Sequence, residues 1–305
     1  MAKIQARNVD DALYLRIEQS AMKNERSLEG EIRIALRAYY QPDDQSTPTL
    51  STREHWQHEC GQRLQWVFDR LMDDNYFREF GQRKKVELPE LVRLARLLGV
   101  SPGLLMDSLD GHREITFGLA DELVKKFAVS ADWLLSGTGS PFPVARIGSA
   151  YREFFLPADG SRGHVFELVR IASGRFEGTL FCLRFHPETQ QYALGVVTEQ
   201  FMLRDGMGGT GHANLKHFLQ FLKAECSDLP MNAFHWTQAP DENDFWQLFG
   251  QHHPLYFQNA AQRTTARWLQ QLLNGEDPGG WFPGWTSELA ALGAMPFGAP
   301  PKDRP

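Results

Sequence analysis

The first forty residues combine one short strand pattern with two short helix patterns. Residues 3–9 alternate between polar and apolar side chains, so one face of the predicted strand is polar. Three side chains lie on that face: Lys3, Gln5 and Arg7. One strand and two helices of this length cannot bury a core by themselves. The pattern therefore predicts a second copy that pairs the strand and interlocks the helices.

Both predicted helices are amphipathic. Asp10 or Asp11 caps the first helix, and Ser27 opens the second. Glu31 stands one position too late to complete a Ser-x-x-Glu capping box with Ser27. The apolar stripes are Leu13, Ile17 and Ala21 in the first helix and Leu28, Ile32 and Leu36 in the second.

The run ARNVDDALYLRIEQSAMKNERSLEGEIRIAL resembles a ribbon-helix-helix DNA-binding domain of the Arc/MetJ superfamily, and it is most similar to the antitoxin-type members. The resemblance covers residues 3–40. It implies a homodimer whose two-stranded ribbon lies in the major groove of double-stranded DNA. The polar strand face is then expected to contact bases, since Lys or Arg suits guanine and Gln suits adenine. The backbone amides of Ser27, Leu28 and Glu29 are expected to hold a DNA phosphate.

Composition gives only coarse limits on function. A chain of 305 residues has room for two or three domains. The net charge of −6 is unusual for a DNA-binding protein, but residues 1–42 hold seven Lys/Arg against six Asp/Glu, and specific binding needs only a local positive stripe. Three widely spaced cysteines, with no signal peptide and no bilayer-spanning apolar run, predict a cytoplasmic protein without a membrane partner.

Changes of pattern divide the chain into five segments. The predicted fold class is multidomain: a ribbon-helix-helix domain, an all-α helix-turn-helix domain of five helices, and an α+β domain. A polar Pro/Ser/Thr-rich stretch separates the first two domains, and a Pro/Gly-rich segment follows the third. The predicted bounds are 1–42 for the first domain, 43–59 for a linker, 60–146 for the helical domain, 147–278 for the α+β domain and 279–305 for a poorly ordered tail.

Residues 60–146 are helical in pattern throughout. The runs LVRLARLLGVSPGLLMDSLDG and ADWLLSGTGSPF resemble the helix-turn-helix of lambda-repressor and Cro. In that family the third helix faces the major groove. Here the matching helix, residues 101–110, has no Lys or Arg and carries two carboxylates, which phosphates repel. Both a DNA contact and a role in oligomerisation or docking stay open. The candidate DNA-contact residues of this domain are Arg83, Lys84, Lys85, Ser101, Gly103 and Arg113.

The last third of the chain mixes strand and helix patterns. Strands are predicted at 165–172, 178–186, 191–198 and 231–236, with the second and third forming a hairpin. Helices are predicted at 244–249 and 260–273. We interpret this domain as a sensor or oligomerisation domain. The aromatic residues between 236 and 257 are expected to be core, and would suit an apolar or aromatic effector if they line a cavity.

No pattern in the chain defines a cofactor, metal or catalytic site. The spacing Gly206–Gly211 matches a dinucleotide-binding loop, but the strand before it belongs to a hairpin, which favours a flexible turn. His55, His58 and Cys60 lack a fourth ligand, so no zinc site is predicted. We predict that the protein is not an enzyme and has no cofactor.

The patterns together predict a homodimeric, sequence-specific transcriptional regulator, a repressor or autoregulator of bacterial, plasmid or phage type. Tetramers on paired half-sites are compatible with two symmetric modules. Two alternatives stay open. One is an antitoxin-like or adaptor protein that binds a protein partner through residues 100–278. The other is a DNA-tethered enzyme with its chemistry in residues 150–275.

Overall fold

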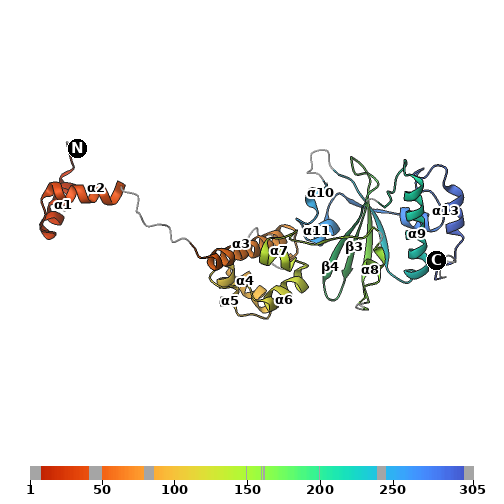
Figure 1. Cartoon of the computed structure of the whole chain (residues 1–305), viewed down its shortest axis with the longest axis horizontal. Coiled ribbons are helices and arrows are strands. Elements are labelled where there is room, and N and C mark those ends of the chain that lie inside the picture. The colour runs from red at the N-terminus through yellow and green to blue at the C-terminus, as the bar shows by residue number, and fades with distance from the viewer. Residues whose placement is uncertain are drawn as a thin grey trace. The chain divides into compact units, whose positions relative to one another are not determined.

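The chain is an α/β protein with a mixed six-stranded sheet (Figure 1). The computed structural model describes residues 8–40, 50–78, 86–148, 150–158, 160, 162–198, 200–238 and 245–298. Two compact units are present, Met1–Arg53 and Glu54–Pro305.

The first unit contains two helices, α1 (Asp11–Lys23) and α2 (Leu28–Tyr40). The Asp10 carboxylate caps α1 by accepting a hydrogen bond from the amide of Ala12 at 2.7 Å. Residues 3–7 of the predicted strand lie outside the described residues. Asn8 has a φ of 61°, a left-handed conformation, so extended backbone does not continue into α1.

A carboxylate joins the two helices of this unit. The Oε1 atom of Glu31 accepts hydrogen bonds from Ser20 Oγ and from Asn24 Nδ2, both at 2.8 Å. The amide of Gly30 donates to Ser27 Oγ at 3.1 Å, so Ser27 supplies half of a capping box. The interpretation that Glu31 does not complete that box is confirmed, because its carboxylate bonds to α1 instead.

Five helices enclose the first core of the second unit. They are α3 (Thr52–Asp73), α4 (Leu88–Leu97), α5 (Pro102–Leu109), α6 (Phe117–Phe127) and α7 (Ala131–Ser136). Ser101, Thr116 and Ser130 cap three of them through side-chain oxygens. The predicted linker over 43–59 is wrong at its C-terminal end, because α3 begins at Thr52.

Six strands follow in the order β1-β4-β3-β2-β5-β6. Their bounds are β1 (Val144–Arg146), β2 (Val165–Ile171), β3 (Leu180–His186), β4 (Gln191–Val197), β5 (Met231–Trp236) and β6 (Arg263–Ala266). β1 is parallel to β4 and β5 is parallel to β2, while the other pairs are antiparallel. The predicted β3–β4 hairpin is confirmed, with His186 opposite Gln191 at its end.

Helices cover both faces of the sheet (Figure 1). They are α8 (Tyr151–Phe155), α9 (Gly209–Glu225), α10 (Phe245–Leu248), α11 (Pro254–Asn259), α12 (Trp268–Leu273) and α13 (Thr286–Gly293). α8, α9, α12 and α13 pack on one face, and α10 and α11 pack on the other. α9 connects β4 to β5, which run in the same direction with β3 and β2 between them.

The central strands are apolar on both sides because both of their faces are buried. In β2, Leu168 packs with α9 and α12 while Val169 packs with α10 and α11. In β3, Cys182 packs on the face covered by α9 and α12, and Phe181 packs on the face covered by α10 and α11. The expectation that the aromatic residues between 236 and 257 form core is confirmed for Trp236, Phe245 and Phe257.

Two predictions for the C-terminal part are wrong. Residues 260–273 are not one helix, since β6 occupies Arg263–Ala266 before α12 begins. The end of the chain is not poorly ordered from residue 279, because Phe282, Trp285 and Leu289 are buried against α9 and α12. A cluster of apolar residues within the Pro/Gly-rich sequence overrides its composition.

Candidate functional sites

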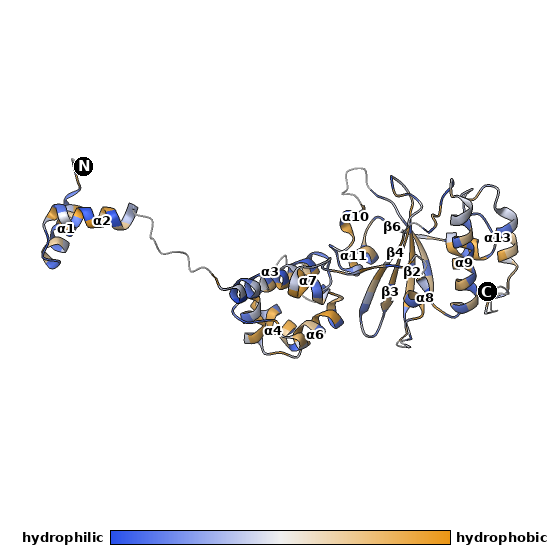
Figure 2. Ribbon diagram, viewed as in Figure 1, coloured by the Kyte–Doolittle hydropathy of each residue, from blue (hydrophilic) through white to orange (hydrophobic). Residues whose placement is uncertain are grey.

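The helices of the first unit expose their apolar residues. Among the described residues of this unit, Ala21 is the one buried apolar side chain. Leu13 is 50% exposed and Ile32 is 38% exposed, although both belong to the predicted inward stripes. Hydrophobic positions recur along both helices between hydrophilic ones (Figure 2). Contiguous exposed apolar residues of this kind commonly mark an interaction surface.

The predicted phosphate-contact residues of this unit, Ser27, Leu28 and Glu29, lie at the start of α2. Ser27 is exposed and Leu28 is partly buried. The first amides of an α-helix have no partner within the helix, and the helix dipole favours an anion there. The position of Ser27 and Leu28 is therefore compatible with a phosphate contact. The predicted base-reading residues, Lys3, Gln5 and Arg7, lie outside the described residues.

The described candidate DNA-contact residues of the helical domain lie on or next to its third helix, α5. Ser101 accepts a hydrogen bond from the amide of Leu104 at 3.2 Å, which uses its hydroxyl as a helix cap. Gly103, Asp107 and Arg113 are exposed. The carbonyl of Asp107 accepts hydrogen bonds from the amides of His112 and Arg113, so Arg113 follows α5 directly. Arg83, Lys84 and Lys85 lie outside the described residues.

This surface is poorly suited to reading bases. The exposed face of α5 offers a glycine and carboxylates, whereas base edges in the major groove are read by Arg, Lys, Asn or Gln. Ser101 caps the start of α5, Gly103 lies in its first turn, and Arg113 follows its end.

A buried polar cluster joins the helical domain to the sheet within the second unit. The Asp74 carboxylate contacts His252 Nδ1 at 2.6 Å and accepts the amide of His253 at 2.7 Å. The His253 ring is fully buried, with Tyr76 and Tyr192 packed against it at centroid distances of 4.7 and 5.1 Å. Burial lowers the pKa of His253 to about 3, so its imidazole is neutral at pH 7.

Other buried charges of the second unit are also internally paired. Arg263 lies 2.8 Å from Glu167, whose other oxygen accepts a hydrogen bond from Gln258 at 3.2 Å. Arg170 donates to Glu177 at 3.0 Å, and burial lowers the pKa of its guanidinium. Pairs of this kind stabilise one arrangement of the chain around them, because breaking either partner strands a buried charge.

The described residues contain neither a candidate metal-ligand cluster nor a candidate membrane-spanning helix. Across the described ranges, no three His, Cys, Asp or Glu side chains cluster as metal ligands. His55 pairs with Glu59 and His58 contacts Gln62, both along the exposed side of α3. None of the helices described is long and apolar enough to cross a membrane.

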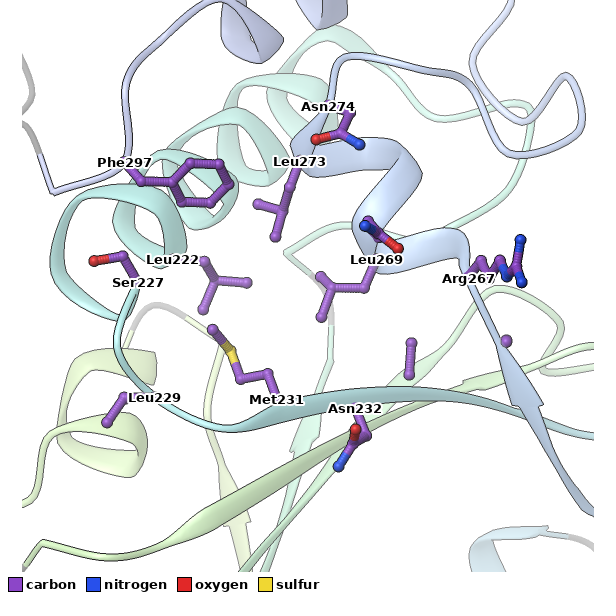
Figure 3. A pocket seen from close by; sticks show the side chains of 13 residues that line it. Leu222, Ser227, Leu229, Met231, Asn232, Arg267, Leu269, Leu273, Asn274 and Phe297 are labelled. Atoms are coloured by element: carbon purple, nitrogen blue, oxygen red, sulfur yellow. The ribbon is translucent and has the colours of Figure 1, made fainter.

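A cavity of about 490 Å³ lies between α9, β5, β6 and α12 (Figure 3). Its lining includes Leu222, Met231, Leu273, Phe297 and Arg267. The aromatic residues Trp236, Phe245 and Phe257 do not line it, because they pack in the core on the opposite face of the sheet. No sequence signal marks the cavity residues, since they come from four separate segments that only the tertiary fold brings together.

Comparison with known proteins gives no relative for this chain: no family model, curated protein or solved structure matches it. A fold does not by itself define a function, which depends on the residues of each site.

Proposed function

We propose that the chain is a sequence-specific, DNA-binding transcriptional regulator that acts as a homodimer. The exposed apolar face of α1 and α2 is the observation that carries this proposal. Leu13 and Ile32 lie on it, and the two helices are too short to bury them alone. A second copy of the same unit offers a matching face by symmetry.

The DNA contacts are assigned to the segment before α1 and to the start of α2. Lys3, Gln5 and Arg7 supply the donors and acceptors that distinguish base pairs in the major groove. The Ser27–Leu28 end of α2 supplies a phosphate contact that positions the ribbon without reading sequence. The acidic face of α5 is assigned no base contact.

The proposal is tested on the full-length chain with DNA that the wild-type protein selects from a random pool. Arg7→Ala removes one base contact twice per dimer, at about 1–3 kcal/mol each, so affinity should fall at least roughly thirtyfold. Asp107→Ala, on the exposed face of α5, is the matched control and should stay near wild-type affinity. The proposal is wrong if Arg7→Ala binds as tightly as wild type in an electrophoretic mobility shift assay.

One observation favours a second candidate, an adaptor that binds a protein partner. Leu88 is 61% exposed and Phe117 is 80% exposed at the starts of α4 and α6, beside an α5 that lacks basic residues. Large exposed apolar side chains commonly mark interaction surfaces. A stoichiometric protein that copurifies with the full-length chain would support this candidate over a stand-alone regulator.

A further inference from the structure

The helical domain exposes apolar side chains on two of its helices. On α4, Leu88 is 61% exposed and Val92 is 45% exposed. On α6, Phe117 is 80% exposed and Val124 is 38% exposed. The members of the first pair are one helical turn apart and those of the second pair are two turns apart, so each pair lies on one side of its helix. Large apolar side chains exposed in this way commonly mark an interaction surface.

Each of these helix surfaces also carries one exposed charge. Arg96 follows Val92 by one turn of α4, and Asp121 follows Phe117 by one turn of α6. Neither Arg96 nor Asp121 forms an ion pair within the described part of the chain. We call the first surface the α4 face (Leu88, Val92 and Arg96) and the second the α6 face (Phe117, Asp121 and Val124).

The two faces are complementary to each other. Both are apolar along most of their length, and their charges are opposite. DNA is a poor match for the α6 face, because phosphates repel the Asp121 carboxylate. Since one chain carries both halves of the complementary pair, a two-fold axis can place the α4 face of each copy against the α6 face of the other. An unrelated protein would have to supply both complements itself.

The proposed homodimer brings two helical domains together. Residues 41–51 alone separate the end of α2 from the start of α3. Two paired first units therefore carry their helical domains on short connections, and domains connected in this way meet at an effective concentration on the order of millimolar. An interface that is too weak to join free chains at micromolar concentration can form under these conditions.

We propose that the two helical domains of the homodimer pair with each other, with the α4 face of each protomer against the α6 face of the other. Arg96 then lies opposite Asp121 of the partner subunit. This inference rests on the proposed homodimer and adds a second interface to the one formed by α1 and α2. The same exposed residues underlie the adaptor candidate, and the charge complementarity within one chain favours a second copy as the occupant.

Hydrogen exchange of the full-length chain, followed by mass spectrometry of the α4 and α6 peptides, tests the proposal. Pairing should slow exchange in the wild-type dimer relative to Ile32→Asp, which separates the first units. For an interface with a dissociation constant on the order of 0.1 mM, an effective concentration on the order of millimolar should slow exchange roughly tenfold. Sedimentation equilibrium on the same samples shows which of them are dimers.

Charge reversal locates the contact. Arg96→Glu and Asp121→Arg should each bring the exchange of both helices to within about twofold of the Ile32→Asp rate, because each places like charges opposite one another. The double variant should regain slow exchange. Every substitution is also made in the Ile32→Asp chain, which corrects for effects on the helix itself. Arg146→Glu, at an exposed position of β1, is the matched control and should change neither peptide.

Four results would overturn the proposal. A wild-type dimer whose α4 and α6 peptides exchange as fast as those of Ile32→Asp would lack this second interface while leaving the first one intact. A wild-type monomer would remove both interfaces. A double charge reversal that fails to restore slow exchange would show that Arg96 and Asp121 do not meet. Slow exchange that requires added DNA or a copurified protein would give the two faces another occupant.

Discussion

Gly61 of α3 lies at the closest approach between that helix and the end of α5. A Cβ atom on Gly61 would stand 2.5 Å from the carbonyl oxygen of Leu109 and 2.7 Å from that of Ser108. Gly111 approaches from the other side, where a Cβ would stand 2.7 Å from His58 Cα. Backbone atoms cannot move aside as flexible side chains can, so both positions require glycine.

Gly61→Ala should destabilise the protein by about 1–3 kcal/mol, because the added methyl group overpacks a rigid contact. Urea unfolding followed by circular dichroism measures this change. Gly103→Ala is the control: a Cβ there meets nothing within 4 Å, and alanine favours a helix by about 0.5–1 kcal/mol. Equal stability of the two variants would contradict the packing argument.

His253 makes the stability of the second unit depend on pH. Its Nδ1 accepts a hydrogen bond from the amide of Leu255 at 3.1 Å, which caps α11, and its Nε2 is buried without a partner among the described residues. Burial lowers its pKa from 6.5 to about 3. The folded protein therefore holds this imidazole neutral while the unfolded chain takes up a proton.

The sign of the effect follows from that difference. Above pH 6.5 the ring is neutral in both states, and below it the stability from this group falls by up to about 1.4 kcal/mol for each pH unit. His253→Asn keeps a side-chain acceptor for the α11 cap but does not titrate. Its urea midpoint should therefore fall less steeply than that of the wild type between pH 6.5 and 5. Parallel slopes would show that His253 is not the group responsible.

At the scale of elements, helices defined by their own periodicity were predicted well. α4 and α6 have apolar residues at helical spacing; α4 carries a proline in its first turn, and a threonine caps α6. These signals are local, so neighbouring structure does not alter them. The segment 260–273 failed because β6 has only four residues and pairs with a strand some thirty positions earlier. Pairing across that distance overrides a weak helical preference.

If the apolar faces of α1 and α2 form the proposed dimer interface, a charge placed there should disrupt the dimer. Ile32→Asp should place a charge in the proposed dimer interface and convert the protein to a monomer, since an unpaired charge buried there is costly. Sedimentation equilibrium measures the mass. Ala38→Asp adds the same charge to another exposed position of α2 and should leave the dimer intact. A monomeric wild-type protein at micromolar concentration would refute the interface.

At the scale of the whole molecule, polar contacts join segments that no sequence pattern connects. Asp74 at the end of α3 holds the amide of His253 at the start of α11, almost 180 residues later. α6 also contacts β4, so the helical domain and the sheet form one unit from Glu54 onward. The boundary predicted at residue 146 separates two cores within that unit, which are formed by different sets of residues.

The sequence by itself determined the elements whose signals are local. Helical stripes, capping residues such as Ser101 and Ser130, and the β3–β4 hairpin follow from contacts between near neighbours. Only the tertiary structure decided the pairing of β1 with β4 and of β6 with β5, the burial of His253 and the cavity beside Met231. Those features depend on where distant segments meet, and such contacts leave no periodic trace in the amino-acid order.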